Sequence, residues 1–128
     1  MRNGGRNIAA ILHRRSASMR WENAYGPGWS VSWQVVFSHR VETDVAEVAA
    51  WYEGKRAGLG WAFVEEVLQV WRELAGNPFF AARRHPTKGL RWRYPERFPY
   101  RIVYEIHESS QTVMVLRVVH AARQDFEY

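Results

Sequence analysis

The sequence predicts an α+β fold in which a two-helix hairpin packs on one face of a mostly antiparallel sheet, in the order β-α-α-β-β-β. Three observations predict it. Two neighbouring apolar stripes at helical spacing lie between residues 41 and 74, a β-branched segment precedes them, and three alternating segments follow residue 89. A chain of 128 residues with 47% hydrophobic residues is sized for one such domain with a single core.

Residues 31–38 (VSWQVVFS) are rich in β-branched and aromatic side chains and predict the first strand. Ser38 is the expected N-cap of the first helix, and the second helix should end at the stop signal GNP, residues 76–78. Gly58 and Gly60 interrupt the helical pattern between the two stripes. The two helices should therefore form an antiparallel hairpin.

Three strands are expected after a long basic loop, at residues 90–94 (LRWRY), 98–106 (FPYRIVYEI) and 112–120 (TVMVLRVVH). Short turns join them into a meander, with 98–106 as its central strand. Alternation places the even-numbered residues of that strand on the core side and Arg101 and Glu105 on the other side.

Residues 1–30 are interpreted as an N-terminal arm, poorly ordered or forming a short helix, and residues 31–128 as the domain. The arm is either an accessory segment that packs on the domain or on a partner, or an extension upstream of the natural start, with Met19 as an alternative start. The pattern assigns no function to it.

The composition excludes several classes of site. The chain has no cysteine, which rules out disulfides, a thiolate nucleophile and a zinc ribbon, and is in keeping with a cytoplasmic location. No window is apolar enough to span a membrane, and the run IAAIL followed by HRR is not typical of a signal peptide. No cofactor is expected.

The net charge of +5 is unevenly distributed. Residues 40–75 carry four bases and seven acids, whereas residues 83–101 carry seven bases and a single acid. Clustered positive charge predicts an acidic or polyanionic partner. The alternative is that the basic residues only form a solvated surface.

Strand pairing by hairpins would place four arginines on the face opposite the helices: Arg91, Arg93, Arg101 and Arg117. A slip of one residue or a bulge would move a whole strand to the other face, so this register is a hypothesis. Such a face could bind phosphates or carboxylates. Alternatively, each arginine is paired with a nearby acid and has a structural role.

Catalytic motifs are scarce. The five histidines have no metal-binding spacing, and there is no GxSxG elbow or P-loop. His120, Arg123 and Tyr128 follow one another near the end of the chain, and these residue types can transfer protons and stabilise phosphate charge during phosphodiester cleavage. The alternative for His120 is a structural hydrogen bond at the end of a strand.

In four consecutive segments the chain resembles the RelE/ParE superfamily, the toxins of type II toxin–antitoxin systems, which include plasmid stabilisation proteins. The segments are VAEVAAWYEGKRAGLGWAFVEEVLQ, NP, RFPYRIVYEI and VLRVVHAAR. The resemblance runs from about Trp33 to Arg123. It implies two helices against an antiparallel sheet and a cognate antitoxin whose acidic, partly disordered tail wraps the toxin, in a heterotetramer or a larger complex.

The resemblance also implies site residues. Arg101 matches the arginine after the aromatic residue of the third strand, and Arg123 matches the phosphate-contacting arginine after the last strand. Arg91 and Arg93 lie near the position of the nuclease branch's paired lysines, although the loop between differs. Tyr128 lies near the position of a base-stacking tyrosine, with a different spacing.

Members of the superfamily differ in their target. The segments RFPYRIVYEI and VVHAAR resemble the ParE branch more closely, which favours a growth-inhibitory toxin acting on DNA gyrase. One alternative is a RelE-like, metal-independent endoribonuclease that cuts mRNA on the ribosome, with Arg101, Arg123, His120 and Tyr128 as catalytic residues. Another is a degenerate, non-toxic binding module.

Overall fold

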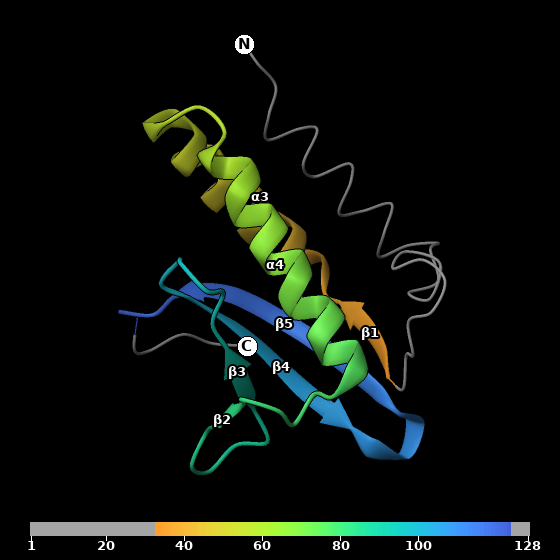
Figure 1. The fold of residues 1–128 in the computed structure, drawn as a ribbon. Helices are drawn as coiled ribbons and strands as arrows, with labels where there is room; N and C mark the ends of the chain where they lie inside the picture. The colour runs from red at the N-terminus through yellow and green to blue at the C-terminus, as the bar shows by residue number, and fades with distance from the viewer. Residues whose placement is uncertain (1–32, 124–128) are drawn as a thin grey trace, which may run out of the picture.

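The structure, a computed structural model, describes residues 33–123, so the expected N-terminal arm and Tyr128 lie outside the described residues. In chain order its elements are β1 (Gln34–Phe37), α3 (His39–Lys55), α4 (Leu59–Gly76), β2 (Arg83–Arg84), β3 (Arg91–Arg93), β4 (Tyr100–His107), the 3-10 helix η1 (Glu108–Ser110) and β5 (Thr112–His120). The two helices lie side by side across the sheet, and their connected ends extend beyond it (Figure 1). The predicted fold class is confirmed.

The strands form one five-stranded sheet in the order β1-β5-β4-β3-β2. β1 pairs with β5 in parallel, and the other three pairings are antiparallel. β4 is the central strand, as predicted. The long basic loop contains one additional strand, the two-residue β2, which pairs with β3.

The glycine turn between the helices depends on two positions. Gly58 has a φ of 88°, a left-handed conformation that glycine adopts without steric cost. Gly60 lies in the first turn of α4, where an added Cβ would clash with the backbone carbonyl of Ala49 on α3. The Glu53 carboxylate accepts hydrogen bonds from the N–H groups of both glycines. The short connection therefore allows close packing of the two helices.

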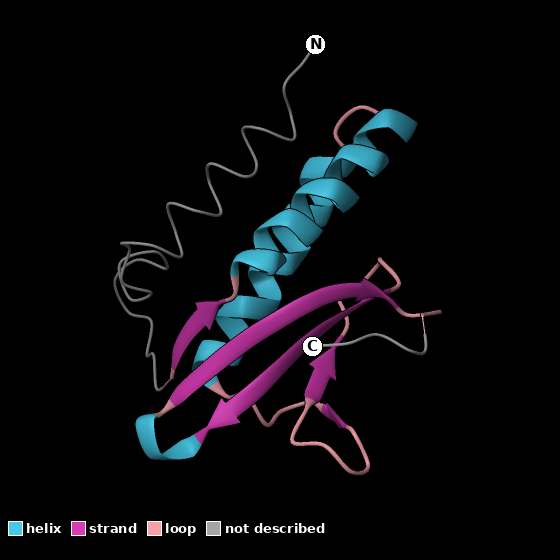
Figure 2. Ribbon diagram, turned by 180° about the vertical axis from the view of Figure 1, so that it is seen from behind, coloured by secondary structure: helices cyan, strands magenta, loops and turns pink. Residues whose placement is uncertain are grey.

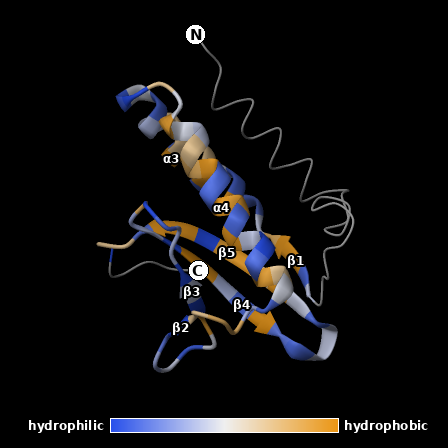
Figure 3. Ribbon diagram, in the orientation of Figure 1, coloured by the Kyte–Doolittle hydropathy of each residue, from blue (hydrophilic) through white to orange (hydrophobic). Residues whose placement is uncertain are grey.

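The core lies between the helices and one face of the sheet, which we call the helix face; we call the opposite side of the sheet the open face. The largest fully buried side chains of the core include Trp71 and Phe63 of α4 and Tyr104 of β4. The even-numbered residues of β4 pack into this core, as alternation predicts. Hydrophobic residues recur along β1, β4 and β5, the strands next to α4 (Figure 3).

Among the described residues, no helix covers the open face, across which β4 and β5 run (Figure 2). A smaller apolar cluster lies on this face and consists of Leu90, Val103 and Val119, with Trp92 and Leu116 packed against them. Because this cluster provides little apolar area, the helix face supplies most of the hydrophobic stabilisation.

Ser38 occupies the predicted N-cap position of α3, but its side chain does not cap the helix. Its hydroxyl donates instead to the carbonyl oxygen of Leu116 on β5, at 2.9 Å. β1 pairs with β5 only as far as Val115. Ser38, just before α3, therefore binds the edge of β5 beyond the point where β1 ends.

The basic strands depart from simple alternation in two places: a bulge in β5, which leaves Arg117 on the open face, and the position of Arg91 and Arg93. A β-bulge falls between Val103 and Tyr104 and their partners, so that Val103 pairs with Arg117 while Tyr104 pairs with Val115. Leu116 is the extra residue of β5, and it changes the alternation of the strand at this point. Met114, Leu116 and Arg117 consequently all lie on the open face.

Arg91 and Arg93 are the second exception. Arg91 pairs with Tyr104 and Arg93 with Ile102, and both partners belong to the helix face. Since paired residues of adjacent strands point to the same side of a sheet, the two arginines lie on the helix face. Of the four arginines expected on the open face, Arg101 and Arg117 lie there and Arg91 and Arg93 do not.

Candidate functional site

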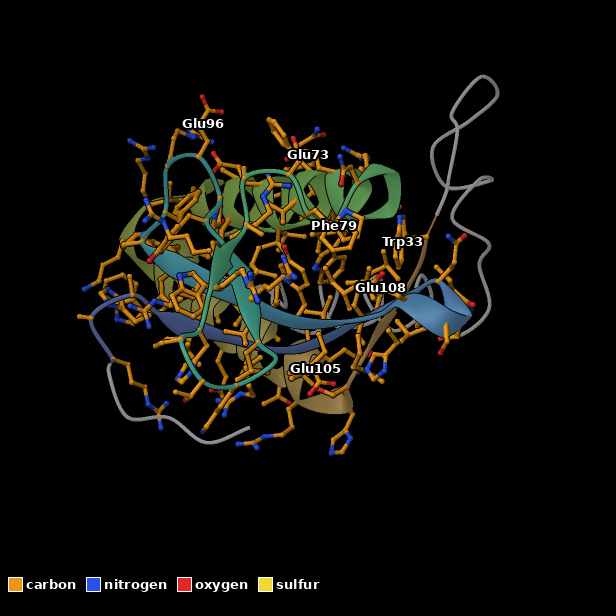
Figure 4. The ribbon with its side chains drawn as sticks, turned by 90° about the horizontal axis from the view of Figure 1, so that it is seen from below. Trp33, Glu73, Phe79, Glu96, Glu105 and Glu108 are labelled. Carbon is orange, nitrogen blue, oxygen red and sulfur yellow. The ribbon has the colours of Figure 1, made fainter. Side chains whose placement is uncertain are left out.

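Arg93 is bound to helix α4. Its Nη2 donates to Glu73 Oε1 at 2.5 Å, and the residue is only 9% exposed. Glu73 lies on the helix side of β4, whereas Glu105 lies on the opposite side (Figure 4). The nearby Arg97 donates from both its backbone N–H and its Nε to Glu66, one helical heptad earlier in α4. These contacts fasten the β3–β4 connection to α4.

Arg117 is bound to helix α3. Its Nε and Nη2 donate to the two carboxylate oxygens of Asp44 at 2.8 and 3.2 Å. Asp44 Oδ2 also accepts the backbone N–H of Val118 at 2.9 Å. Both side chains of the pair are nearly nine-tenths buried. The pair closes the edge of β5 that β1 leaves uncovered, and so the arginine has a structural role.

Arg91 lies against an aromatic pair next to the α4–β2 loop. Its Cζ is 5.0 Å from the centre of the Phe79 ring, and Phe79 in turn contacts Trp33 edge to face at 5.7 Å. Figure 4 shows these two rings close to each other. The following residue, Phe80, is 67% exposed. This corner therefore presents an apolar surface next to a positive charge.

Arg101 is the central basic residue of the open face. Its Cζ lies 4.9 Å from the centre of the Trp92 ring, and its Nε is 3.3 Å from the Tyr94 hydroxyl. A guanidinium over an indole is attracted by the negative face of the ring. The side chain is partly exposed, and its preferred orientation is set by the aromatic residues of the β3 region.

His120 and Arg123 lie at the same end of the β4–β5 hairpin as Arg101, because Arg101 pairs with Val119. His120 Nδ1 accepts the N–H of Ala122 at 3.0 Å, and the N–H of Arg123 donates to the His120 carbonyl at 3.0 Å. Both side chains are exposed. His120 pairs with Tyr100, which packs on the helix face, so the His120 ring lies on the face opposite Arg101. Arg101 and His120 therefore lie at one end of the sheet but on opposite faces.

The surroundings of this end are tyrosine-rich. The His120 ring contacts Tyr100 edge to face at 5.0 Å. Burial, and secondarily the neighbouring Tyr52, raises the pKa of Tyr100. A tyrosine with a raised pKa stays neutral and is less ready to act as a base. Among residues 33–123 no group of His, Cys, Asp and Glu could hold a metal ion. The chemistry this end offers is anion binding by arginine.

The sequence reasoning missed Trp92 and Tyr94 as the residues that orient Arg101. Because Arg91 and Arg93 were expected on the open face, the alternation implied the core side for Trp92 and Tyr94. A signal was present in α4, where Glu66 and Glu73 are seven residues apart and thus lie on one helix face. Two carboxylates next to a sheet need cationic partners, and that requirement would have placed Arg93 on the helix face.

Comparison with known proteins identifies the family. The family profile described as the ParE toxin of the type II toxin–antitoxin system parDE matches residues 35–125. The chain belongs to the ParE toxin family. The match covers all described strands except the first residue of β1 and includes Arg101, His120 and Arg123.

Solved structures of toxin–antitoxin systems have a similar fold. The chromosomal ParDE system from P. aeruginosa has a TM-score of 0.61 at 15% sequence identity, over 71% of this chain and 98% of that one. The RelBE2 toxin–antitoxin complex from Mycobacterium tuberculosis has a TM-score of 0.52 at 22% identity, over 70% and 99% of the two chains. The archaeal RelE–RelB complex from Pyrococcus horikoshii OT3 has a TM-score of 0.50 at 12% identity, over 73% and 99%.

At these identities the similarity defines the fold, which ParE and RelE proteins share. No curated protein matches the chain significantly. Neither described helix of this ParE family member is long and apolar enough to cross a membrane.

Proposed function

We propose that this chain is a growth-inhibitory toxin of a type II toxin–antitoxin system, that it acts on DNA gyrase in the cytoplasm, and that a cognate antitoxin neutralises it. The observation that carries the proposal is the ParE toxin profile over residues 35–125, which spans nearly the whole described domain. ParE toxins are the branch for which the resemblance implies gyrase as the target.

The distribution of the arginines supports a binding role over a catalytic one. Arg93 and Arg117 are held in ion pairs with the helices, and Arg91 lies against Phe79. Arg123 is exposed and Arg101 is partly exposed, and His120 lies on the face of the sheet opposite Arg101. Two arginines at the end of a sheet suit contacts with a protein partner, since arginine is enriched among the residues that dominate binding energy.

The proposed antitoxin is an acidic segment that becomes ordered on binding. The corner formed by Phe79, Phe80 and Arg91 offers it apolar contacts next to a cation, and Arg101 offers a second cation on the open face. Segments that fold on binding cover large, discontinuous surfaces of this kind. Both partners, together with a heterotetrameric or larger assembly, are part of the proposal.

The deciding experiment adds the purified full-length chain to gyrase and plasmid DNA. The proposal predicts loss of supercoiling and accumulation of cleaved DNA, both reversed by the antitoxin. Arg101→Ala and Arg123→Ala should weaken the effect, whereas Arg40→Ala, an exposed change on α3, should not. If induced cells stop growing while gyrase remains fully active and the DNA intact, gyrase is not the target.

An mRNA endonuclease is the second candidate, because Arg101, His120 and Arg123 belong to one end of the β4–β5 hairpin, with Arg101 and His120 on opposite faces of the sheet. In that case the arginines would stabilise charge on the scissile phosphate, His120 would transfer a proton, and Tyr128 would stack on a base. Primer extension on translated message should then show codon-phased cuts that Arg123→Ala abolishes. Intact message in arrested cells would reject this candidate, and unimpaired growth after induction would indicate a non-toxic binding module.

A further inference from the structure

A cleft lies between the outer flank of α4 and the β3–β4 connection, away from the candidate site at the end of the β4–β5 hairpin. Its volume is about 300 Å³. Figure 4 shows Glu73 and Glu96 on the same side of the sheet, one from each wall of the cleft. The side chains that matter for its chemistry are Glu66, Val70 and Glu73 on the helix and Arg93, Tyr94 and Glu96 on the connection.

One nitrogen of Arg93 has no hydrogen-bond acceptor. Its Nη2 donates to Glu73 Oε1 at 2.5 Å, whereas Nη1 is buried and has no partner among residues 33–123. The residue as a whole is about nine-tenths buried. A buried N–H without an acceptor is unfavourable and rare in folded proteins. Because Arg93 lines the cleft, a ligand that enters it can supply the acceptor.

The cleft carries net negative charge, with three carboxylates against one guanidinium. Arg93 binds Glu73, and Arg97 binds Glu66. Glu96 is exposed and has no partner among residues 33–123. Phosphates and acidic segments are repelled by such a surface, and a ligand that carries a cation is attracted to it.

The acceptor for Nη1 has to be a neutral oxygen. An anionic oxygen would be repelled by the Glu73 carboxylate, which lies 2.5 Å from the other terminal nitrogen of the same guanidinium. The carbonyl of a peptide bond accepts a hydrogen bond without carrying charge. A cleft of this volume is at the lower end of the range for ligand pockets, which suits a short stretch of peptide and not a nucleotide.

We propose that this cleft binds a basic segment of a partner protein. A main-chain carbonyl of the segment accepts from Arg93 Nη1, and a lysine or arginine side chain pairs with Glu96. Val70 and Tyr94 provide apolar contact for the aliphatic part of that side chain. One guanidinium thus fastens β3 to α4 through Nη2 and binds the partner through Nη1. The partner has the opposite charge to the proposed antitoxin, so the inference does not depend on the gyrase proposal.

The test is a nuclear magnetic resonance titration of the isotope-labelled full-length chain with the blocked peptide acetyl-Gly-Lys-Gly-amide. The side-chain signals of Arg93 should shift, because Nη1 gains an acceptor. Arg93→Lys keeps the charge beside Glu73 but replaces the fork of nitrogens by a single one, and it should weaken binding about 5-fold. Glu96→Gln should weaken binding about 3-fold and make it less dependent on salt.

The matched control is Glu65→Gln, which removes an exposed charge of α4 outside the cleft and should leave the affinity unchanged. A second control is n-butylamine, which has the lysine charge without a carbonyl and should bind about 5-fold more weakly than the peptide. Circular dichroism shows whether each variant is folded. If Arg93→Lys fails to fold, the Arg93 signals of the wild type and the affinity of Glu96→Gln decide the question.

Three results would overturn the proposal. The peptide may leave the Arg93 signals unchanged, which would mean that Nη1 is only hydrated. Folded Arg93→Lys may bind the peptide as tightly as wild type, or n-butylamine may bind as tightly as the peptide, which would reduce the cleft to an acidic surface. Neither gyrase nor an antitoxin is present in the titration, so each result leaves the gyrase proposal to its own test.

Discussion

On the helix face of the sheet Arg93 contacts Glu73 and is 9% exposed, whereas on the open face Arg101 lies over Trp92 and remains partly exposed. The two residues come from neighbouring strands and have the same chemistry. A buried guanidinium needs a carboxylate partner, because an unpaired charge in the interior costs far more than a hydrogen bond returns. A partly exposed one can be held by an aromatic ring and still bind a partner.

This difference between a buried and a partly exposed arginine affects how alanine scans of basic toxins are interpreted. Loss of a buried, paired arginine leaves an unpaired carboxylate and lowers stability, which lowers the amount of folded protein. Loss of an exposed arginine leaves the fold intact and reports on binding. Both changes would reduce growth inhibition by a toxin in cells, so only a stability measurement separates the two roles.

The strongest test of the comparison is removal of the carboxylate that holds Arg117. Asp44→Ala should lower the free energy of unfolding by about 3–5 kcal/mol, because it removes the carboxylate that a buried guanidinium contacts through two nitrogens. It also leaves the N–H of Val118 without its acceptor. Urea unfolding followed by circular dichroism measures the change. Glu47→Ala, an exposed change on the same helix, is the control and should cost less than about 0.5 kcal/mol.

A double change sharpens this test. Asp44→Leu/Arg117→Met removes both charges while keeping most of the volume, and it should recover much of the stability lost in Asp44→Ala. If Asp44→Ala is as mild as Glu47→Ala, the pair is not a structural anchor and Arg117 returns to the list of candidate binding residues.

The next largest effect concerns pH and a buried tyrosine. Burial raises the pKa of Tyr104 from its ordinary 10.0 to about 12, against the smaller opposing effect of Arg93 and Arg91. The folded state thus favours the neutral hydroxyl, which donates to the carbonyl of Pro78 at 2.7 Å. The resulting stability is fully present below pH 10 and is lost as the pH rises from about 10 to about 12, to the extent of about 2–3 kcal/mol.

Tyr104→Phe removes this dependence. The variant should be about 1–2 kcal/mol less stable at neutral pH, since the Pro78 carbonyl loses its donor, and its stability should fall less steeply above pH 10. Tyr94→Phe, at an exposed tyrosine near Arg101, should keep the wild-type pH dependence. Parallel pH curves for wild type and Tyr104→Phe would contradict the assignment.

A smaller loss is expected at Arg93 itself. Arg93→Ala should cost about 1–2 kcal/mol, less than the change at Asp44, because Glu73 is partly exposed and can regain water when its partner is removed. The double variant Arg93→Ala/Glu73→Ala should cost little more than Arg93→Ala alone, as thermal unfolding can show. Additive losses would mean that the two side chains do not interact.

The fold was predictable because each element carries a local signal. β5 has its predicted bounds, Thr112–His120, and α4 ends at the predicted stop, since β-branched alternation and a Gly-Asn-Pro sequence act within a few residues. The arginine face was not predictable in the same way. One extra residue, Leu116, reverses the alternation of β5, and a bulge leaves no mark in a run such as MVLRVV.

In β3 the face that meets the helices was equally hard to predict. Its alternation is clear, but the sequence places tryptophan and arginine on opposite faces without stating which face meets the helices. Glu73 decides it, by providing a carboxylate at the helix face twenty residues before Arg93. Strand pairing places Arg101 and His120 at one end of the sheet on opposite faces, which the sequence pattern did not predict. Their roles on a target remain proposals.

The smallest effect on stability, and the largest on function, is expected at Arg101. Arg101→Ala should change the free energy of unfolding by less than about 1 kcal/mol, the usual worth of an exposed cation–π contact. Growth inhibition by the induced chain should nevertheless fall, because the residue is the central cation of the open face. Arg101→Lys is the matched variant: it keeps the charge but loses the planar group that stacks on Trp92 and makes bidentate contacts, and it should fall between wild type and alanine. If Arg101→Ala inhibits growth as strongly as wild type while Arg93→Ala does not, the helix face carries the function and the division between the two faces is wrong.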